Sequence, residues 1–361
     1  MTLKKLESIG DGHFLTNQNN SNILEHGSSL SGKRMAMLAE TTSFGIGHST
    51  TIVGRSRAGD ATAFAIPELK WLFDCGARVQ TWKPRKIFLT HAHSDHVHFL
   101  MRFRDEDRPP TIYLPEASVP FVEACMKAYQ EMIDCASSTP TTNEEEEKEK
   151  TATSKRPIKK VEYVLRATKP DEEIFFSQGG HKFVMRTLNM DHRIPCLGYS
   201  IFKIQNRLKD EYRGLPGKEI GQLRKSGVEI TTTKEESYLC FMGDTTAKVF
   251  QDYPEILNYH KILVVECSFI DEKSGERAKT TKHMHWDDLR PIVASHPETM
   301  FVLIHFSLKY STLSLRLFFH RQQLLYDNIH PMLIEREVEE QWNMTGKQGP
   351  VPRCNCRVCR D

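Results

Sequence analysis

The sequence predicts an α/β fold built as a sandwich of β-sheets, with its chemistry on one rim. Short apolar runs typical of strands recur along most of the chain, whereas long helical patterns are few. Four of these runs end in a side chain that can bind a metal ion or a proton: His91, Asp244, Glu266 and His305. Because the strands of a sandwich end along a common rim, we expect these side chains to lie close together.

Composition limits the classes of protein that the chain can represent. A chain of 361 residues can form one large domain or two small ones. Its 49 basic and 47 acidic side chains leave a net charge of +2, so nucleic-acid binding would need a local basic patch. No stretch is apolar enough to cross a membrane and no secretory leader is visible, so we expect an intracellular protein, cytoplasmic and/or nuclear, without membrane contact. Its nine cysteines are then expected to be reduced.

Composition also predicts the domain boundaries. Residues 1–45 are rich in Asn, Ser, Gly and Thr, which favours a disordered extension over a transit peptide. The folded domain is expected at 46–335. Within it, residues 137–157 carry a run of glutamates and predict a disordered insert, with a solvated helix end as the alternative. Residues 336–361 are expected to be a cysteine-containing tail.

Inside the domain, the spacing of apolar residues predicts each element in turn. Residues 117–135 repeat apolar side chains every three or four positions, as a helix does. Residues 207–229 are charged and contain glycine, which indicates an excursion from the sheet. The predicted strands are 50–53, 61–66, 71–76 with a tight turn, 87–89, 111–114, 161–165, 174–176, 182–188, 199–204, 238–242, 262–265 and 300–304.

The strongest chemical signal is a group of four potential metal ligands within six positions. His91 and His93 point the same way on an extended segment, because side chains repeat every second residue. Asp95 can share that face, and the turn brings in His96. Imidazole nitrogen and carboxylate oxygen suit zinc or a similar divalent ion. Once distal ligands are added, four ligands in one loop exceed what a single tetrahedral zinc needs, which favours two metal ions.

Segment 91–96 resembles the His-x-His-x-Asp-His loop of the metallo-β-lactamase superfamily. Later segments resemble ribonuclease Z in its short plant-type form, the endonuclease family that trims the 3′ ends of precursor tRNA. The similar segments are 243–245 (Gly-Asp-Thr), 266–269 (Glu-Cys-Ser-Phe), 305–310 (His-Phe-Ser-Leu-Lys-Tyr) and the charged stretch 207–217. The resemblance covers roughly residues 48–315 and implies a four-layer αββα metallo-β-lactamase sandwich.

The same resemblance implies the residues of the site. One zinc ion would bind His91, His93 and His192, and the second would bind Asp95, His96 and His305, with Asp244 bridging them. Asp95 would also orient or deprotonate the attacking water, and His283 would be the catalytic acid, although its near neighbour His285 could compete. The implied cofactor is two Zn²⁺ per chain, with Mn²⁺ possible, and the implied partners are precursor tRNA and a second subunit of a homodimer.

Three departures from the family pattern stand out. His98 follows the first motif, where it would crowd the site or simply pack. Lys309 stands where the family has arginine, so the bidentate fork is lost. No Gly/Pro-rich protruding arm is recognisable, and region 117–160 stands in its place. Candidate phosphate-contacting segments are therefore the basic stretches 155–160, 207–213 and 218–225.

Two rival functions and one unusual tail stay open at this point. A thioesterase or lactonase of the same fold would use the same metal ligands, whereas a non-catalytic RNA-binding protein would not need the complete set. In the tail, Cys354, Cys356 and Cys359 could bind a third zinc with a partner ligand, carry a lipid or remain free. A fourth ligand for such a zinc is not evident from the sequence.

Overall fold

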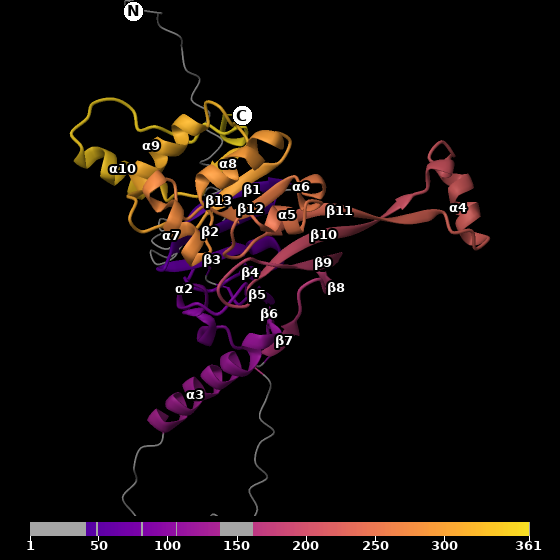
Figure 1. The fold of residues 1–361 in the computed structure, drawn as a ribbon. Helices are drawn as coiled ribbons and strands as arrows, with labels where there is room; N and C mark the ends of the chain where they lie inside the picture. Colours follow the sequence, from indigo (N-terminus) through magenta and orange to yellow (C-terminus); the bar gives the residue numbers. More distant parts are fainter. Residues whose placement is uncertain (1–40, 48–49, 81, 106, 138–161, 361) are drawn as a thin grey trace, which may run out of the picture.

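The computed structural model of the protein describes residues 41–47, 50–80, 82–105, 107–137 and 162–360. Most of the predicted extension and acidic insert, and the basic stretch 155–160, lie outside these described residues. The described part forms two β-sheets with helices around them, and a long ribbon projects from one side (Figure 1).

The first sheet is formed mainly by the N-terminal half of the chain. Its strand order is β1 (Thr42–Gly47), β2 (Thr50–Ala58), β3 (Ala61–Ile66), β4 (Trp71–Phe73), β5 (Lys86–Phe88), β6 (Thr111–Pro115) and β7 (Val164–Thr168), with β14 (Phe306–Ser307) paired to β2. β1 to β4 are antiparallel neighbours, whereas β4 to β7 run parallel. β4 and β5 therefore end at the same edge of the sheet.

The second sheet is formed by the C-terminal half. Its strand order is β15 (Ile329–Pro331), β13 (Met300–Ile304), β12 (Ile262–Glu266), β11 (Thr231–Phe241), β10 (Leu197–Leu208), β9 (His181–Asn189) and β8 (Glu173–Gln178). β11, β12, β13 and β15 are parallel, and β10 is antiparallel to both β9 and β11. β9, β11, β12 and β13 consequently point the same way and end at one edge.

The helices follow the two halves of the chain. The first half contains η2 (Pro67–Leu69), α2 (Ser94–Val97), η3 (Leu100–Arg102), η4 (Glu116–Ser118) and α3 (Val119–Ser137). The second half contains η6 (Asp210–Tyr212), α4 (Gly217–Lys225), α5 (Val249–Asp252), α6 (Ile256–Tyr259), η7 (Glu272–Ser274), α7 (Gly275–Thr281), α8 (Trp286–Ser295), α9 (Thr312–Gln322), α10 (Glu335–Met344) and α11 (Arg357–Arg360). None of the described helices is long and apolar enough to span a membrane.

Three apolar clusters divide the fold into four layers. The middle cluster joins the inner faces of both sheets and includes Trp71, Phe88 and Phe241. A second cluster packs the outer face of the first sheet against Val122 and Met126 of α3. The third packs the outer face of the second sheet against α5, α6, α8, α9 and α10. Each large apolar side chain buried in this way contributes about 1.5–3 kcal/mol to folding. The predicted αββα sandwich is confirmed.

The packed domain extends beyond both predicted boundaries. β1 begins before residue 46, because Phe44 and Ile46 alternate with exposed neighbours and turn into the core. α10 belongs to the domain rather than to the tail, because Val338 is fully buried in the apolar cluster beneath it. One or two apolar side chains within a polar stretch form too short a pattern to be recognised from the sequence.

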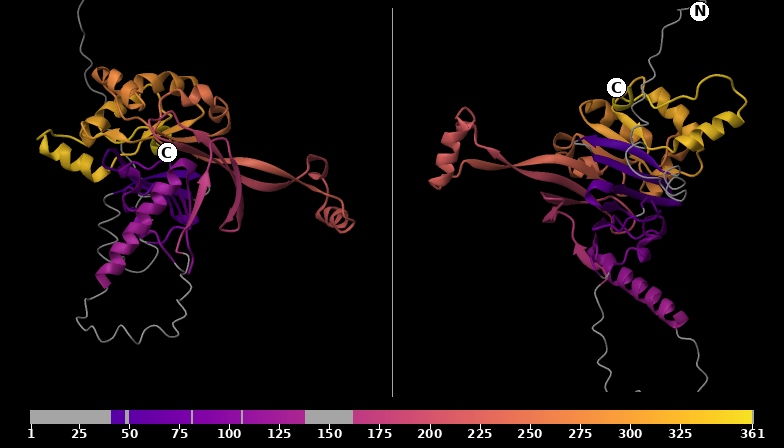
Figure 2. Two further views of the ribbon diagram at one scale, coloured as in Figure 1. Left: turned by 60° about the horizontal axis from the view of Figure 1, so that its bottom comes forward. Right: turned by 180° about the vertical axis from the view of Figure 1, so that it is seen from behind.

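The ribbon that projects from the second sheet is here called the arm (residues 205–234). β10 and β11 continue past β9 and stay paired from Gln205–Lys234 to Leu208–Thr231. α4 lies at the far end of the arm, as Figures 1 and 2 show, and none of its residues is buried. The predicted excursion at 207–229 is confirmed, but the expectation that the chain lacks an arm is wrong. The arm is built from charged residues rather than from the Gly/Pro-rich sequence that was sought.

Candidate metal centre

The predicted ligands meet at the rim where the two sheets face each other. His91 lies just beyond β5, and Asp95 and His96 lie in the short helix α2 that follows. In the second sheet, the predicted ligands follow the strands that end at a common edge: His192 after β9, Asp244 after β11 and His305 after β13. The fold therefore brings together ligands that lie far apart in the sequence: His91 and His305 are separated by 214 positions (305 − 91).

The first ligand group contains His91, His93, His192 and one oxygen of Asp244. His93 Nδ1 lies 2.9 Å from His91 Nε2 and 3.3 Å from His192 Nε2. Asp244 Oδ2 is 3.6 Å from His91 Nε2. Two ligands bound at about 2.0–2.1 Å in a tetrahedral site would be roughly 3.3–3.4 Å apart, so this spacing fits a single divalent ion.

The second ligand group contains Asp95, His96 and His305, and it shares Asp244 with the first. His305 Nε2 lies 3.3 Å from both Asp95 Oδ2 and His96 Nε2. Asp244 Oδ1 lies 3.4 Å from His305 Nε2 and 3.5 Å from His96 Nε2. The two oxygens of Asp244 thus face different ligand groups, an arrangement in which one carboxylate would contact an ion in each group.

The protonation states of these side chains favour bound cations. Burial lowers the pKa of His91 well below its ordinary value, which leaves a lone pair for a metal. Burial alone would raise the pKa of Asp244, but His305, His96 and His91 hold that pKa well below its ordinary value. Burial also opposes protonation of His96, yet Asp244 and Asp74 raise its pKa well above normal. This corner of the site therefore attracts positive charge, which a divalent ion would supply.

A second group of residues orients the ligands. Asp74 accepts hydrogen bonds from the backbone N–H of Thr90 (2.7 Å) and from His96 Nδ1 (2.8 Å). This contact leaves His96 Nε2 facing the ligand group. His192 Nδ1 donates to the carbonyl oxygen of Lys282 (3.2 Å). Sequence reasoning missed the role of Asp74, and the only available signal was its place in the tight turn after an apolar strand.

Sequence comparison identifies relatives of the chain. The family model described as Metallo-beta-lactamase superfamily matches residues 62–126. The chloroplastic tRNase Z TRZ2 of Arabidopsis thaliana is 29% identical over 277 residues, which is 74% of this chain and 70% of that protein. The nuclear ribonuclease Z of Triticum aestivum is 30% identical over 188 residues, which is 50% of this chain and 92% of that protein. The chain belongs to the ribonuclease Z family. Among solved structures, the short form of human tRNase Z is 17% identical, with a TM-score of 0.46, over 78% of this chain and 94% of that chain.

In this member of the ribonuclease Z family, the structure distinguishes between the two candidate histidines. His283 Nδ1 lies 2.9 Å from Glu266 Oε1 and 3.8 Å from Asp244 Oδ2, at the edge of the ligand groups. His285 is instead used structurally: its Nε2 donates to the carbonyl oxygen of Asp271 (2.9 Å), and its Nδ1 accepts from the first turn of α8. His283 is therefore the histidine that faces the site.

Glu266 is a second residue whose role sequence reasoning missed. Its buried carboxylate accepts hydrogen bonds from the backbone N–H of Thr245 (2.8 Å) and from Ser268 Oγ (2.6 Å). Burial alone would lower the pKa of His283, but the charge and hydrogen bond of Glu266 raise it to about 9. Its segment carried part of the family resemblance, but only the structure shows that the Glu266 carboxylate contacts His283 and raises its pKa.

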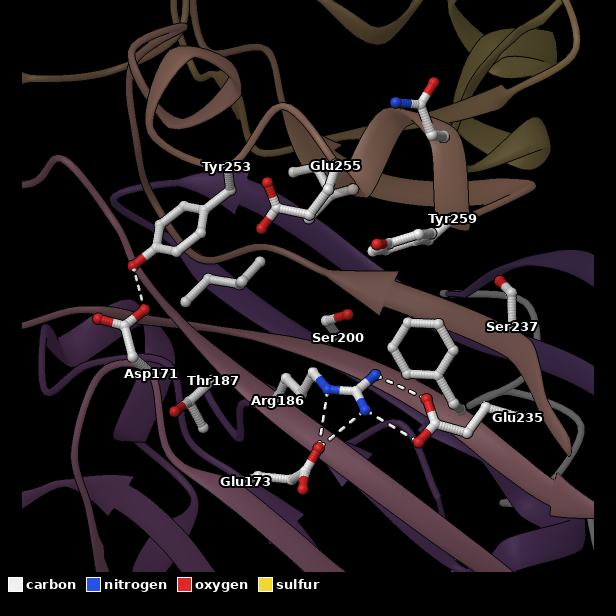
Figure 3. Close-up of a pocket in the computed structure, with 14 residues that line it drawn as sticks. Asp171, Glu173, Arg186, Thr187, Ser200, Glu235, Ser237, Tyr253, Glu255 and Tyr259 are labelled. Atoms are coloured by element: carbon white, nitrogen blue, oxygen red, sulfur yellow. Dashed lines mark hydrogen bonds and ion pairs between the residues drawn. The ribbon is translucent and has the colours of Figure 1, made fainter. Parts of the chain in front are cut away.

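Other predicted features lie outside the ligand groups. His98 is exposed, so it does not crowd the site. Lys309 pairs with Asp271 at 2.6 Å instead of forming a bidentate fork. A pocket of about 820 Å³ opens among β8 to β11, α5 and α6, and its lining residues include none of the predicted ligands (Figure 3). Its Arg186 is paired with Glu173 and Glu235, so the arginine offers no free charge to a phosphate.

Gly76 gives a direct test of how tightly the ligand loop packs. A Cβ at this position would lie 1.6 Å from the backbone oxygen of Asp95, a distance that backbone atoms cannot tolerate. We expect Gly76→Ala to lower the free energy of unfolding by about 1–3 kcal/mol or more and to displace α2. Gly45→Ala is the matched control, because its Cβ would meet nothing within 4 Å. Denaturant unfolding of both variants checks this prediction, and equal stability of the two would contradict it.

Proposed function

We propose that this protein is a zinc-dependent endoribonuclease that removes the 3′ trailer from precursor tRNA. Two features together support this function. The first is a complete set of seven ligands arranged as two groups around Asp244. The second is His283 beside them, whose Nδ1 lies 2.9 Å from Glu266 Oε1 and whose pKa this carboxylate raises. The relatives named tRNase Z and ribonuclease Z support the choice of substrate.

The proposed centre holds two Zn²⁺ per chain, with Mn²⁺ as a possible substitute. Paired divalent ions supply an activated water and stabilise the charge of a phosphodiester and its leaving oxygen. The chain's own residues determine where this chemistry takes place. Asp95 accepts a hydrogen bond from the Gly59 N–H (2.9 Å). Burial alone would raise the pKa of Asp95, but its hydrogen bond with His305 and the charges of His96 and His305 lower that pKa below the ordinary value. Asp95 is thus ionised and positioned to orient the water by accepting its proton in a hydrogen bond.

His283 has the properties that the acid in this reaction needs. The oxygen that leaves the cleaved phosphate must acquire a proton, and a protonated imidazole held by Glu266 can donate one. The His283 side chain is 14% exposed, so one part of its ring is accessible to a substrate. A second pocket, of about 320 Å³, opens next to His192 and is lined by Arg193, Lys248 and Lys282. Lys248 is paired with Asp252 and Lys282 with Asp191, so Arg193 is the cation of this lining best suited to contact a phosphate near the cleaved bond.

The arm gives the body of the tRNA a separate place to bind. Between residues 207 and 225 it carries six basic side chains (Arg207, Lys209, Arg213, Lys218, Arg224 and Lys225) against three acidic ones, a local charge of +3. A helix that buries no residue adds nothing to the core, so its charged surface remains available for a partner. Phosphates of a double-stranded RNA are recognised largely by shape and charge, which suits these exposed cations. The stretches 207–213 and 218–225 thus remain candidate tRNA contacts.

Cleavage of a 3′-extended precursor tRNA by the purified protein tests the function. We expect a cut immediately 3′ of the discriminator base, loss of activity with a chelator and recovery with Zn²⁺ or Mn²⁺. Asp95→Ala should abolish the cut, because it removes both a ligand and the group that orients water. A mature tRNA without trailer is the control substrate. Metal-loaded wild-type protein that leaves the precursor intact but hydrolyses a thioester or lactone would contradict the proposal in favour of another hydrolase.

Arg224 and Lys225 allow the role of the arm to be separated from catalysis. We expect Arg224→Ala/Lys225→Ala to raise KM for precursor tRNA about 3- to 30-fold and to reduce the salt dependence of binding, because two phosphate contacts are lost. Hydrolysis of a small phosphodiester such as bis(p-nitrophenyl) phosphate should not change. Arg336→Ala/Lys347→Ala removes the same charge from the region of α10 and should leave KM unchanged. An equal effect of both double variants would exclude a specific role for the arm.

The assembly state and the compartment are part of the same proposal. We propose a homodimer, which sedimentation of the full chain would detect directly. A cytoplasmic or nuclear location also stays a prediction, since the relatives include one protein named chloroplastic and one named nuclear. Fluorescence of a tagged full-length chain in its own cells would decide between these compartments.

A further inference from the structure

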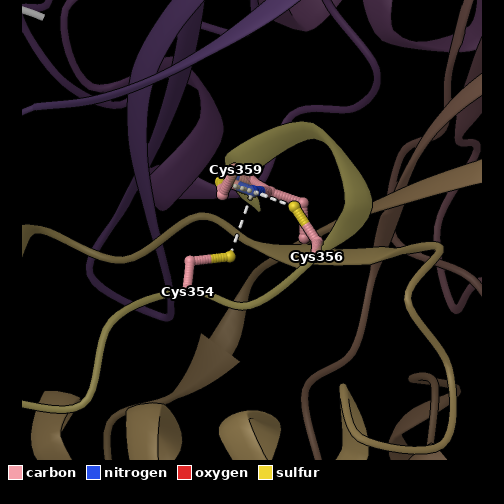
Figure 4. Close-up of side chains that lie close together, drawn as sticks. Cys354, Cys356 and Cys359 are labelled. Atoms are coloured by element: carbon pink, nitrogen blue, oxygen red, sulfur yellow. Dashed lines mark hydrogen bonds between the residues drawn. The ribbon is translucent and has the colours of Figure 1, made fainter. Parts of the chain in front are cut away.

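A second group of metal-binding side chains lies away from the catalytic rim. Near the C-terminus, the thiols of Cys354, Cys356 and Cys359 point toward a common centre (Figure 4). The fourth member is His330 in β15, which precedes Cys354 by 24 residues. From these four side chains we infer that the chain contains a third, structural zinc site of the Cys₃His type, separate from the two catalytic ions.

The distances within this group fit a tetrahedral zinc ion. His330 Nδ1 lies 3.4 Å from Cys356 Sγ and 3.5 Å from the Sγ atoms of both Cys354 and Cys359. With zinc bonds of about 2.0–2.1 Å to nitrogen and 2.3 Å to sulfur, tetrahedral geometry puts those atoms roughly 3.5 Å apart. All four ligand atoms lie within 4.8 Å of one another. A single ion at their centre can therefore contact every ligand without rearranging the backbone.

The surroundings are those of a built site rather than of a free tail. Cys356 is fully buried, and His330 is 7% exposed and packs against Phe44. Buried Gln323 donates through Nε2 to Cys354 Sγ (3.0 Å) and accepts through Oε1 from the backbone N–H of Asn355 (2.8 Å). Hydrogen bonds of this kind orient metal-bound thiolates. This packing argues against the lipidated and free forms of the tail that the sequence had left open.

The chemistry of the four side chains selects zinc over the alternatives. Zinc binds three thiolates and one imidazole in closed structural sites, and a C-x-x-C spacing such as Cys356–Cys359 is common among them. The thiols bind as thiolates and release their protons to water, and no oxidation takes place. The three cysteines are free thiols in the structure. A site with four protein ligands leaves no open position for a substrate, so its role is structural.

The position of the site indicates what it stabilises. His330 pairs in register with Val302 of β13, the strand that leads to His305. The tail is held next to it by Arg357, whose backbone N–H donates to the carbonyl oxygen of Asp327 (2.8 Å). The zinc would therefore join the C-terminal tail to the edge of the second sheet. His330 pairs with Val302, two residues before the end of β13, and His305 follows that end directly.

Cobalt substitution separates this site from the catalytic centre, because none of the predicted catalytic ligands is a thiolate. We expect the cobalt-grown wild-type chain to show an intense near-ultraviolet thiolate-to-Co²⁺ band together with visible bands of a tetrahedral ion. Asp244→Ala should retain the thiolate band, since it affects only the other ions. Cys359→Ser should lose it, and Cys359→His should restore a tetrahedral spectrum. Cys359 is exposed, so these variants are expected to fold, and exposed Cys125→Ser on α3 is the matched control.

Metal analysis of the zinc-grown protein gives the second readout. Cys359→Ser should contain about one zinc per chain less than the wild type or Cys125→Ser. The inference is overturned if the metal-loaded wild type shows no thiolate band. It is also overturned if two of these cysteines form a disulfide, which would lower the intact mass by two hydrogen atoms relative to the fully reduced chain. Failure of precursor cleavage would leave both readouts unaffected, so the third zinc and the proposed function are tested independently.

Discussion

Asp244→Ala should lower kcat/KM for precursor tRNA by at least about 10³-fold, the largest effect expected of any single substitution. Asp244 faces both ligand groups, with Oδ2 toward His91 and Oδ1 toward His96 and His305. Paired ions contribute several kcal/mol to transition-state stabilisation, and each 1.4 kcal/mol corresponds to about tenfold in rate. Removing the bridge should weaken both ions together, so the loss should appear in kcat and in metal content.

Measurement of zinc by mass spectrometry alongside kinetics tests this prediction. Asp252→Ala removes an exposed carboxylate paired with Lys248 and serves as the control, with expected wild-type metal content. Circular dichroism should show that Asp244→Ala retains the sandwich. A variant that keeps both catalytic ions and at least a tenth of the wild-type activity would show that Asp244 does not bridge them.

His283→Ala should lower kcat by about 10²- to 10⁴-fold while the metal content stays unchanged. The reason is that His283 belongs to neither set of proposed ligands and is proposed to donate a proton rather than to bind an ion. Its contact with Glu266 raises its pKa to about 9, above the ordinary value of a histidine. An acid must be protonated to act, so kcat/KM should be level through neutral pH and fall as pH rises through about 9.

Glu266→Gln tests the origin of that alkaline limb. Glutamine keeps the size of the side chain but removes its negative charge, so the pKa of His283 should fall and the limb should move to lower pH. Glu272→Gln, an exposed neutralisation nearby, should leave the profile in place. A merely structural role for Glu266 would lower the rate equally at every pH. Loss of zinc from His283→Ala would show that His283 is a ligand and not the acid.

Most of the residues whose roles were predicted from the sequence lie in a short local pattern. His91 to His96 form one loop after an apolar strand, and Asp244 and His305 each follow a buried strand directly. An apolar run determines a strand, and the strand's end places the next polar side chain at the rim. For that reason, the sequence alone determined the fold class and most strands, whereas the proposed ligand set was implied by the family resemblance of its motifs.

The tertiary structure decided what depends on contacts between distant segments. Asp74 orients His96 across 22 positions, Glu266 pairs with His283 across 17, and no local pattern reveals either pair. The arm carries no apolar period, so its projection follows only from the pairing of β10 with β11. The tail cysteines indicated three zinc ligands, but the fourth, His330, became visible only because β15 pairs with β13 beside the tail. Local spacing determines secondary structure, whereas the partner of a buried polar group is determined by how the sheets and tail pack.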